Sequence, residues 1–563
     1  MLKFMYYELF RTKRKRFELQ RLYLFLIPLL LIFATSSAFS EGVFRLPPAT
    51  IAEDNKSLAS IKKIQVKQFE FVGNTVISDE QLREITDKYL QQLLSIEQLL
   101  AIKQKLTKLY INKGFINSGA ILADQKIKDG KIIYTIKEGT LSEVKLLGNE
   151  TINEDYLSAK IFQNGESREG VLNLFKLQKS LKLLEQSPLI EGVDAQLSPG
   201  LKPGQSNLSV AVKEAKAYQL SFKMDNHRSP SIGAERGQIE FNHNNLFGSG
   251  ERLYLNYGIL DDKDDYVLNM SIPLNANKTR AGFSIERDSS TVLSEPFNSL
   301  GFTSDIRRVM VNLNHRLKHA LNEDMSAGIQ FSMAESNTKL LGEPFAFPPG
   351  VAEARVNELS LYVNWVKRDS QRVFAARSEI GVGLPILTAT ERDHDLPDGR
   401  FIRWNGQFQW LQNLSFWSAE SLFRVNMQLS NDNLLSMNQF AAGGANTVRG
   451  YRENILVRDN GIVASLEAHI PLIEFNIPGF QQKSFASNLN LVPFLDYGYA
   501  WNHDDFLLDP EHIVSIGLGI TWKVDKRLSA EIFWGKDLKK VAVENGSNLQ
   551  DKGIHMQLVL HVL

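Results

Sequence analysis

Alternation between apolar and polar residues with a period of two runs through the second half of the chain and constrains the fold more than any other feature. It extends from about Tyr218 to Leu563, where helical spacing of apolar residues is lost. Because successive side chains of a strand point to opposite faces, each segment predicts a strand with one apolar face. Five such apolar sets are Leu253, Leu255, Tyr257 and Ile259; Leu268, Met270, Ile272 and Leu274; Leu359, Leu361, Val363 and Trp365; Phe423, Val425, Met427 and Leu429; and Ile516, Leu518, Ile520 and Trp522.

The polar face of these strands separates a membrane barrel from a soluble sandwich, in which strands also alternate. Here the polar positions include arginines, such as Arg252 and Arg424, and aromatic residues lie near the strand ends. An apolar outer wall around a wet lumen has this signature. The 346 residues after Ala217 (563 − 217) supply about sixteen antiparallel strands, at roughly 20–22 residues per strand and connection. We therefore expect residues 217–563 to form an all-β transmembrane barrel that encloses a channel.

The first forty residues have the pattern of a secretory signal peptide. Basic residues from position 11 to 21 precede an apolar run from 22 to 34 and a group of small residues, with cleavage expected after Ala38 or Ser40. A retained anchor is the alternative, but the apolar run is short for a span of about 20 residues. Residues 41–60, with Pro47-Pro48 and few apolar side chains, predict a short flexible lead-in.

Composition excludes several classes of function. The 64 basic residues balance 64 acidic ones, so no global charge favours a nucleic-acid partner. The chain has no cysteine, which excludes disulfides, thiolate metal sites and a thiol nucleophile. No cofactor is expected, and the sequence contains no nucleotide-binding Gly-Lys motif.

The front half contains two copies of one small module. The segment from Phe71 to Asn74 recurs 75 residues later as the segment from Leu146 to Asn149. Self-similarity at a fixed period indicates a duplicated unit. We assign residues 61–139 to the first copy and residues 140–216 to the second.

Each copy predicts the element order β-α-α-β-β. In the first, Ser95 and Gln98 form a capping box before a helix that ends at Gly114, and a strand from Lys131 to Glu138 closes the unit. In the second, a helix ends near Ser187-Pro188 and the last strand runs from 207 to 214. Apolar residues at helical spacing are Leu99, Ile102, Leu106 and Leu109 in the first copy and Leu174, Leu177, Leu181 and Leu184 in the second.

This module, including its helix end from Tyr110 to Phe115, resembles the POTRA domain. The resemblance implies a periplasmic module that holds unfolded or partly folded clients. A sheet edge beside an amphipathic helix can accept an extended segment by β-augmentation. In the first copy we expect client contacts from Leu99, Ile102, Leu106 and Tyr110. The alternative is that both modules are inert spacers.

Two short motifs in the barrel half point to one contact. The first is Val448-Arg449-Gly450-Tyr451, inside a glycine-rich stretch that permits a folded hairpin. The second is a strand in which Phe494, Asp496 and Gly498 share one face, while Leu495, Tyr497 and Tyr499 share the lipid face. An inward carboxylate among apolar and glycine neighbours favours a cation partner, and Arg449 could reach it.

Together these motifs resemble the Omp85 superfamily, in which the arginine at the tip of a loop inside the barrel pairs with an aspartate of the wall. With two POTRA modules, the chain from residue 61 onward is similar to the two-partner secretion transporters, the hemolysin secretion/activation (TpsB) group. Further matching stretches run from Leu197 to Gly200, from Asp225 to Arg228 and from Asn244 to Gly250.

The resemblance implies an outer-membrane transporter with its POTRA modules in the periplasm. They would recognise one secreted partner protein, of adhesin or cytolysin type, and the barrel would export it as an extended chain. Folding of the client outside would then drive export. The implied partners are this exoprotein, outer-membrane lipid and, during biogenesis, the barrel-assembly machinery.

Three other classes of function fit the sequence less well. A factor that assembles outer-membrane proteins usually has more POTRA copies than two, and a diffusion porin needs neither POTRA modules nor the paired motifs. An enzyme is not expected, because no Ser-His-Asp grouping or carboxylate pair is readable and Asp393-His394-Asp395 lies in a polar loop.

Two features depart from the family pattern. Residues 41–60 lack the amphipathic pattern of the plug helix that many relatives carry, and the chain ends in His561-Val562-Leu563 rather than an aromatic residue.

Overall fold

A computed structural model of the chain describes residues 63–163, 170–259, 265–291, 302–345, 351–392, 396–475, 487–503, 510–542 and 548–562. The predicted signal peptide and lead-in, residues 1–40 and 41–60, lie outside these ranges, as do residues 393–395. Within the described ranges, none of the helices has the length and apolar character needed to cross a membrane.

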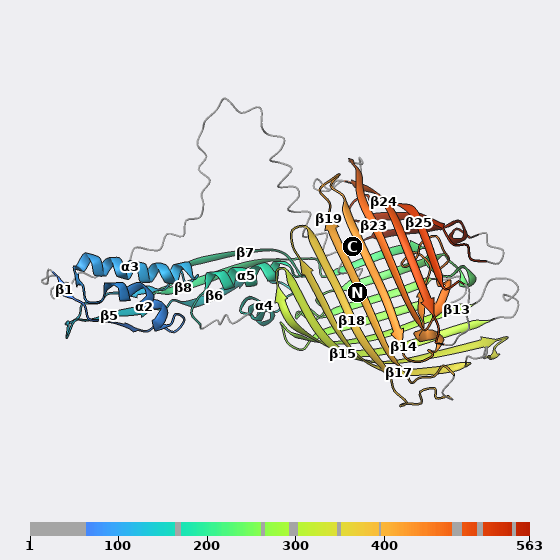
Figure 1. The fold of residues 1–563 in the computed structure, drawn as a ribbon, viewed down its shortest axis with the longest axis horizontal. Helices are drawn as coiled ribbons and strands as arrows, with labels where there is room; N and C mark the ends of the chain where they lie inside the picture. Colours follow the sequence, from blue (N-terminus) through green and yellow to red (C-terminus); the bar gives the residue numbers. More distant parts are fainter. Residues whose placement is uncertain are drawn as a thin grey trace, which may run out of the picture. The chain divides into compact units, whose positions relative to one another are not determined.

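The first module packs two helices against a three-stranded sheet (Figure 1). Strand β5 lies at its centre, parallel to β2 and antiparallel to β4. The predicted capping box is present: Ser95 accepts from the Gln98 backbone N–H at 3.3 Å, and the Gln98 side chain accepts from the Ser95 backbone N–H at 2.8 Å. The elements are β1 (Ile64–Gln65), β2 (Gln68–Val72), α2 (Asp79–Thr86), η2 (Asp87–Tyr89), β3 (Leu93–Leu94), α3 (Ile96–Asn112), β4 (Gly119–Ile121) and β5 (Lys131–Lys137).

The second module has the predicted β-α-α-β-β order, which the first module also follows, with an added pair of two-residue strands, β1 and β3. Its sheet has β8 between a parallel β6 and an antiparallel β7. In both modules a glutamate after the last strand binds the turn that follows the first: Glu138 accepts from the Thr75 N–H at 2.7 Å, and Glu214 from the Thr151 N–H at 3.0 Å. The elements are β6 (Thr140–Leu147), α4 (Glu154–Ile161), α5 (Leu174–Glu185), β7 (Ile190–Pro199) and β8 (Gln205–Glu214).

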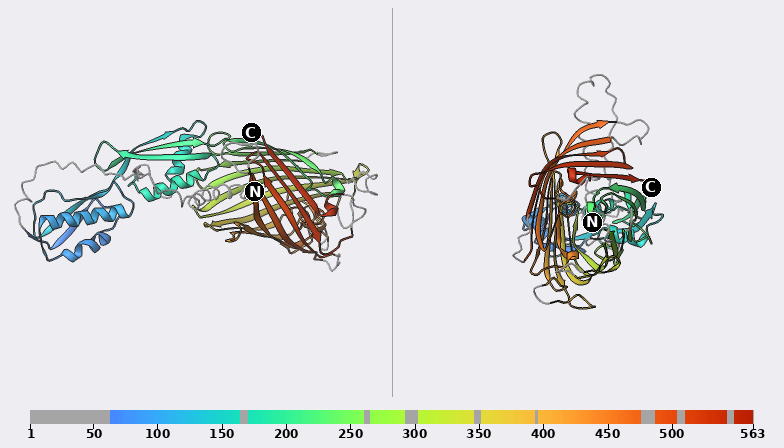
Figure 2. Two further views of the ribbon diagram at one scale, coloured as in Figure 1. Left: turned by 90° about the horizontal axis from the view of Figure 1, so that it is seen from above. Right: turned by 90° about the vertical axis from the view of Figure 1, so that its right-hand side faces the viewer.

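From Tyr218 onward the described strands close into an antiparallel barrel of sixteen strands, with the two-residue β16 as an extra pairing (Figures 1 and 2). The predicted fold class is therefore confirmed. The strands are β9 (Tyr218–Asp225), β10 (Arg236–His243), β11 (Arg252–Ile259), β12 (Asp265–Pro273), β13 (Thr279–Thr291), β14 (Thr303–Ala320), β15 (Glu323–Leu340), β16 (Glu343–Pro344), β17 (Glu353–Arg368), β18 (Arg372–Gly383), β19 (Ile402–Asn413), β20 (Glu420–Ser430), β23 (Asn460–Phe475), β24 (Ser487–Trp501), β25 (His512–Lys523), β26 (Leu528–Asp537) and β27 (Ile554–His561).

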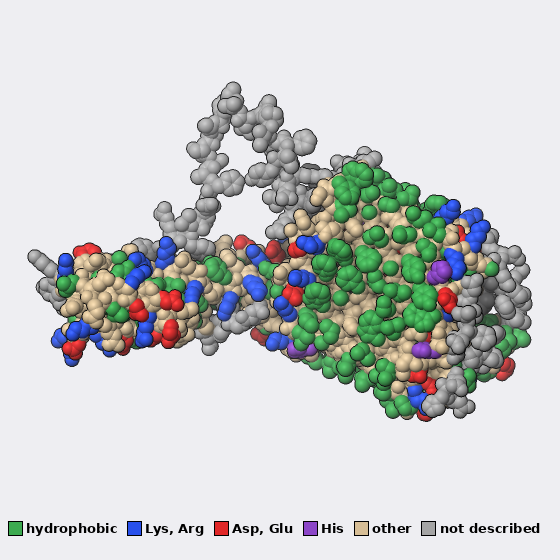
Figure 3. Space-filling view, in the orientation of Figure 1, with side chains coloured by type: hydrophobic (Ala, Val, Ile, Leu, Met, Phe, Trp, Pro, Cys, Tyr) green, Lys and Arg blue, Asp and Glu red, His purple; other side chains and the backbone are tan. Residues whose placement is uncertain are grey.

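The alternation separates an outer wall from an inner one. Leu361 is 60% exposed and Leu495 47% exposed, although both are apolar, because they point outward. Hydrophobic side chains cover most of the visible barrel wall, and charged side chains gather near its ends (Figure 3). Such a band is the surface that lipid would cover.

Residues 431–459, between β20 and β23, form a loop that we call the lumen loop. It contains η5 (Ser436–Asn438), β21 (Phe440–Ala442) and β22 (Leu456–Arg458), and the last two pair with each other. Its side chains contact inward-facing residues of the wall, which places the loop inside the barrel.

Candidate functional site

Glycines shape the tip of the lumen loop. Gly450 has a φ of 91°, a conformation that side chains rarely adopt, and a Cβ there would lie 2.9 Å from the Gly535 carbonyl group. On the wall, a Cβ at Gly498 would lie 2.9 Å from the Val448 side chain. Glycine at these two positions lets the tip pack directly against the inner wall.

The structure brings Arg449 of the tip and Asp496 of β24 together. The Arg449 Nε and Nη2 groups donate to the two Asp496 carboxylate oxygens, each at 2.8 Å, and the Arg449 backbone N–H donates to the same carboxylate at 3.0 Å. The Nη1 group donates to Glu467 at 2.7 Å, and Nη2 also donates to Ser465 at 3.0 Å. One guanidinium thus joins the tip to both β23 and β24.

Almost no water reaches this contact. The Asp496 side chain is fully buried and that of Arg449 is 3% exposed. The guanidinium carbon lies 3.8 Å from the centre of the Phe494 ring and 4.9 Å from that of Phe533. These rings exclude water and add a cation–π contact, so charge is concentrated in a low-dielectric site.

Three neighbours of Arg449 hold the rest of the tip. Val448 is fully buried in an apolar cluster with Ile513. The Tyr451 hydroxyl lies 2.8 Å from the backbone carbonyl oxygens of Val514 and Lys539. Arg452 pairs with Asp551. The tip motif is therefore bound along its whole length to the wall formed by β24–β27.

A second, separate anchor lies at the base of the lumen loop. The Arg403 Nη2 group of β19 donates to both carboxylate oxygens of Glu358 in β17, at 2.8 and 2.7 Å. Arg403 also donates to the backbone carbonyl oxygen of Asn438 at 3.2 Å, and Gln428 donates to the same oxygen at 3.0 Å. We call the contacts centred on Arg449 the tip anchor and those centred on Arg403 the base anchor.

Comparison with known families now places the chain. The family described as "Haemolysin secretion/activation protein ShlB/FhaC/HecB" matches residues 204–522, and "POTRA domain, ShlB-type" matches residues 64–139. The chain belongs to this haemolysin secretion/activation family. The tip anchor thus lies in the barrel of a haemolysin secretion/activation protein.

Individual relatives agree with the family. The outer membrane transporter CdiB of Escherichia coli is 23% identical over 491 residues, which cover 83% of this chain and 77% of that protein. The heme/hemopexin transporter protein HuxB of Haemophilus influenzae (strain 86-028NP) is 24% identical over 452 residues, covering 77% and 75%.

Solved structures share the fold. CdiB from Escherichia coli superposes with a TM-score of 0.67 at 19% identity and covers 92% of this chain and 94% of that one. BamA from Haemophilus ducreyi lacking POTRA domains 1–3 gives a TM-score of 0.53 at 14% identity, covering 89% and 100%.

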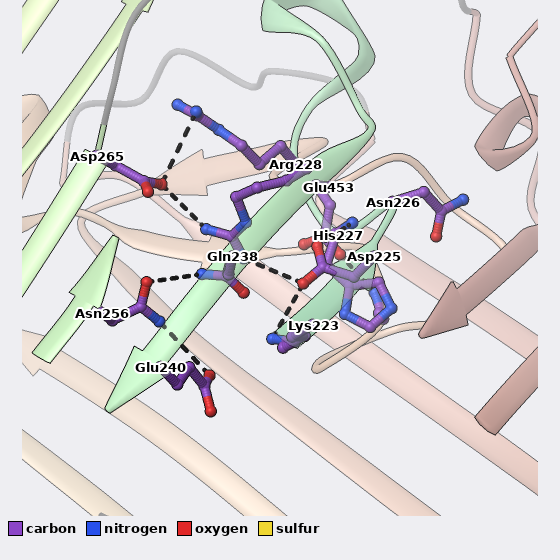
Figure 4. Close-up of polar contacts among 12 residues, drawn as sticks. Lys223, Asp225, Asn226, His227, Arg228, Gln238, Glu240, Asn256, Asp265 and Glu453 are labelled. Atoms are coloured by element: carbon purple, nitrogen blue, oxygen red, sulfur yellow. Dashed lines mark hydrogen bonds and ion pairs between the residues drawn. The ribbon is translucent and has the colours of Figure 1, made fainter. Parts of the chain in front are cut away.

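The family stretch from Asp225 to Arg228 contributes to another polar network of the lumen wall. Asp225 pairs with Lys223 at 3.0 Å, and Arg228 lies 3.9 Å from Asp265 (Figure 4). Arg228 also lies 2.8 Å from Asp288. These contacts connect the end of the first barrel strand to β12 and β13.

The prediction that four residues of α3 in the first module contact the client directly is wrong. Leu99, Ile102, Leu106 and Tyr110 are at most 1% exposed and form the core between α3 and the sheet. Their helical spacing marks the face that packs inward, since burying that stripe is what stabilises a helix on a sheet. The Tyr110 hydroxyl donates to Glu138 at 3.2 Å, and burial raises the pKa of this phenol.

Our sequence interpretation missed the base anchor. Glu358 and Arg403 each have an outward apolar neighbour, Leu359 and Ile402, so alternation places both charges in the lumen. Two inward charges of opposite sign on strands separated by one other strand were the available signal. Among the residues that the structure describes, no group of three or more His, Cys, Asp or Glu side chains is placed to hold a metal ion.

Proposed function

We propose that this chain is an outer-membrane transporter that exports one secreted partner protein, of adhesin or cytolysin type, as an extended chain through the barrel. The observation that carries the proposal is the tip anchor: a buried arginine holds a loop across the lumen of a barrel preceded by POTRA modules. Passive diffusion needs no such loop, whereas regulated passage of a polypeptide does. Relatives described as transporters support the same reading.

The orientation follows from strand order. Strand β8 ends at Glu214 and β9 begins at Tyr218, so the modules join the barrel at the end where β9 starts. With the modules in the periplasm, as expected for this family, the first barrel strand, β9, runs from the periplasmic end to the outer end. Every other odd-numbered strand of the barrel then runs in the same direction. The eleventh barrel strand, β20, then ends on the outside, and the lumen loop enters from there. Outer-membrane lipid would cover the apolar band, after insertion by the barrel-assembly machinery.

Client recognition in the first module is assigned to its sheet edge in place of the buried helix face. Strand β4 pairs with β5 alone in the described sheet, and Ile121 at its end is 46% exposed. An edge strand offers main-chain groups to an extended client, with an apolar side chain beside them. To pair with a client, the Ala120 N–H of β4 would have to leave the Thr107 hydroxyl, to which it donates at 3.1 Å.

Export of the partner protein into the medium tests this proposal. Deletion of residues 61–139 should abolish export while the barrel remains folded, as judged by its heat-modifiable migration. A finer variant, Ile121→Asp, should reduce export, whereas the matched change Leu201→Asp at a fully exposed turn of the second module should not. Undiminished export after the deletion would leave the first module as a spacer.

A further inference from the structure

A concave site lies on the outer face of the barrel, at the ends of β13, β14, β15 and β17 that point away from the modules. Its volume is about 670 Å³. The lining side chains share the outward parity of Val309 and Leu361, so they face the surroundings of the barrel and not its lumen. All are polar or charged: Arg287, Ser289, Thr303, Asp305, Arg307, Glu335, Asn337, Lys339, Glu353 and Arg355.

The site begins where the apolar band stops. On β14, Val311 is 47% exposed, Val309 is the next outward residue, and Arg307 follows two positions later. On β15, Met333 is 40% exposed and Glu335 follows in the same way. Same-face neighbours on a strand lie about 7 Å apart. The site therefore adjoins the apolar band, at the level where lipid headgroups meet acyl chains.

Carboxylates hold the cations of the site in place. Asp305 accepts from Arg287 at 2.9 Å and from Arg307 at 3.1 Å, and Glu335 accepts from Arg355 at 3.4 Å. A guanidinium has five N–H donors, of which Arg307 uses one here. Lys339 makes no hydrogen bond or ion pair with any residue that the structure describes. Four cations against three carboxylates leave an excess of one positive charge.

We propose that this site binds the phosphorylated headgroup of a glycolipid in the outer leaflet, with the acyl chains lying along the adjoining apolar band. Arginine forks and a lysine ammonium match the oxygens of a phosphate monoester. The polar volume accommodates sugar hydroxyls, and the band below favours a lipid over a free anion. This inference rests on the proposed function only for the orientation of the barrel, which puts these strand ends outside.

Binding is measured on the purified full chain in neutral detergent, by native mass spectrometry. The probes are lipopolysaccharide, the same glycolipid after enzymatic removal of its phosphates, and inorganic phosphate. The test variant is Arg307→Gln with Lys339→Gln. The matched control, Lys318→Gln with Lys367→Gln, removes two cations from the opposite ends of β14 and β17.

We expect the test variant to bind lipopolysaccharide about thirtyfold more weakly, since each lost surface cation should weaken binding by about fivefold. The control should bind like the parent chain, and dephosphorylated glycolipid should bind parent and variant equally weakly. Equal loss in test and control variants would show general charge attraction and overturn the site. If inorganic phosphate binds as tightly as the glycolipid, the site recognises phosphate alone, and the assignment of a lipid ligand is overturned. Neither result depends on export, so the proposed function is tested separately.

Discussion

The tip anchor and the base anchor hold the same loop by the same chemistry, an arginine paired with an inward carboxylate, but in different surroundings. At the tip, the Asp496 side chain is fully buried and two phenylalanine rings cover the guanidinium. At the base, the Arg403 side chain is 14% exposed and Glu358 is 4% exposed. An uncompensated charge costs more where less water can reach it. The tip should therefore control whether the loop stays folded, and the base should control its path.

The largest effect should come from Arg449→Ala or Asp496→Ala. Arg449→Ala leaves the buried Asp496 carboxylate without a cation, which costs about 3–5 kcal/mol. Asp496→Ala should cost less, because Arg449 keeps its ion pair with Glu467 at 2.7 Å. Export should fall to background while the barrel still inserts and migrates as a folded species. Arg449→Lys should restore export only in part, because an ammonium lacks the planar fork that grips both oxygens of Asp496.

A double-mutant cycle decides whether the tip pair acts as a pair. Export and urea unfolding are measured for both single alanine variants and for the double variant. If the two losses simply add, Arg449 and Asp496 are not coupled. The claim that the tip anchor holds the loop more strongly than the base anchor then fails.

A smaller loss is expected from Gly450→Ala, which keeps every charge of the tip. The alanine Cβ would meet the Gly535 carbonyl group at 2.9 Å, and the φ of 91° is strained for alanine. Together these effects should cost about 1–3 kcal/mol and shift the tip away from β26. Urea unfolding and export are the measurements, with Gly342→Ala as the control, since φ there is 85° but a Cβ meets nothing within 4 Å. Equal losses in both variants would trace the effect to backbone strain alone.

Breaking the base anchor should lower export less than either change at the tip. Glu358→Gln keeps the shape but leaves Arg403 facing a neutral amide, at a cost of about 1–3 kcal/mol. We expect lowered export and noisier single-channel current, because Arg403 loses its ion pair and holds Asn438 less firmly, while Gln428 and the tip still bind the loop. Glu379→Gln is the matched control: it breaks an inward pair with Arg377 on β18, for which no contact with the loop is present among the described residues. If both variants show equal current noise, the noise comes from the loss of any inward ion pair and not from the base anchor.

The contrast also explains what could be predicted from the sequence. Alternation predicted the barrel and the inward face of Asp496, because strand parity depends only on local order. The family motif then predicted its partner Arg449. The base anchor needs Glu358 and Arg403 to meet across β18, and that depends on the register of two strand pairings that no short motif reports.

The first module shows the opposite error. Helical spacing correctly located the apolar face of α3 but was read as a client surface, when a three-stranded sheet covers it. Amphipathic spacing indicates which side of a helix is apolar. It does not indicate whether that side packs against the same chain or against a partner.

The smallest effect, and the sharpest test of two separate anchors, is the coupling between them. Arg449 and Arg403 share no bonded partner in the described contacts, so their losses should add within about 0.5 kcal/mol if the two ends of the loop move independently. The cycle combines Arg449→Ala with Glu358→Gln and measures urea unfolding of each variant. If the loop instead unfolds as one body, Arg449→Ala alone should already release the base, and adding Glu358→Gln should cost nothing further. That second outcome would mean that the lumen loop unfolds as one cooperative unit and that the tip anchor alone keeps it folded.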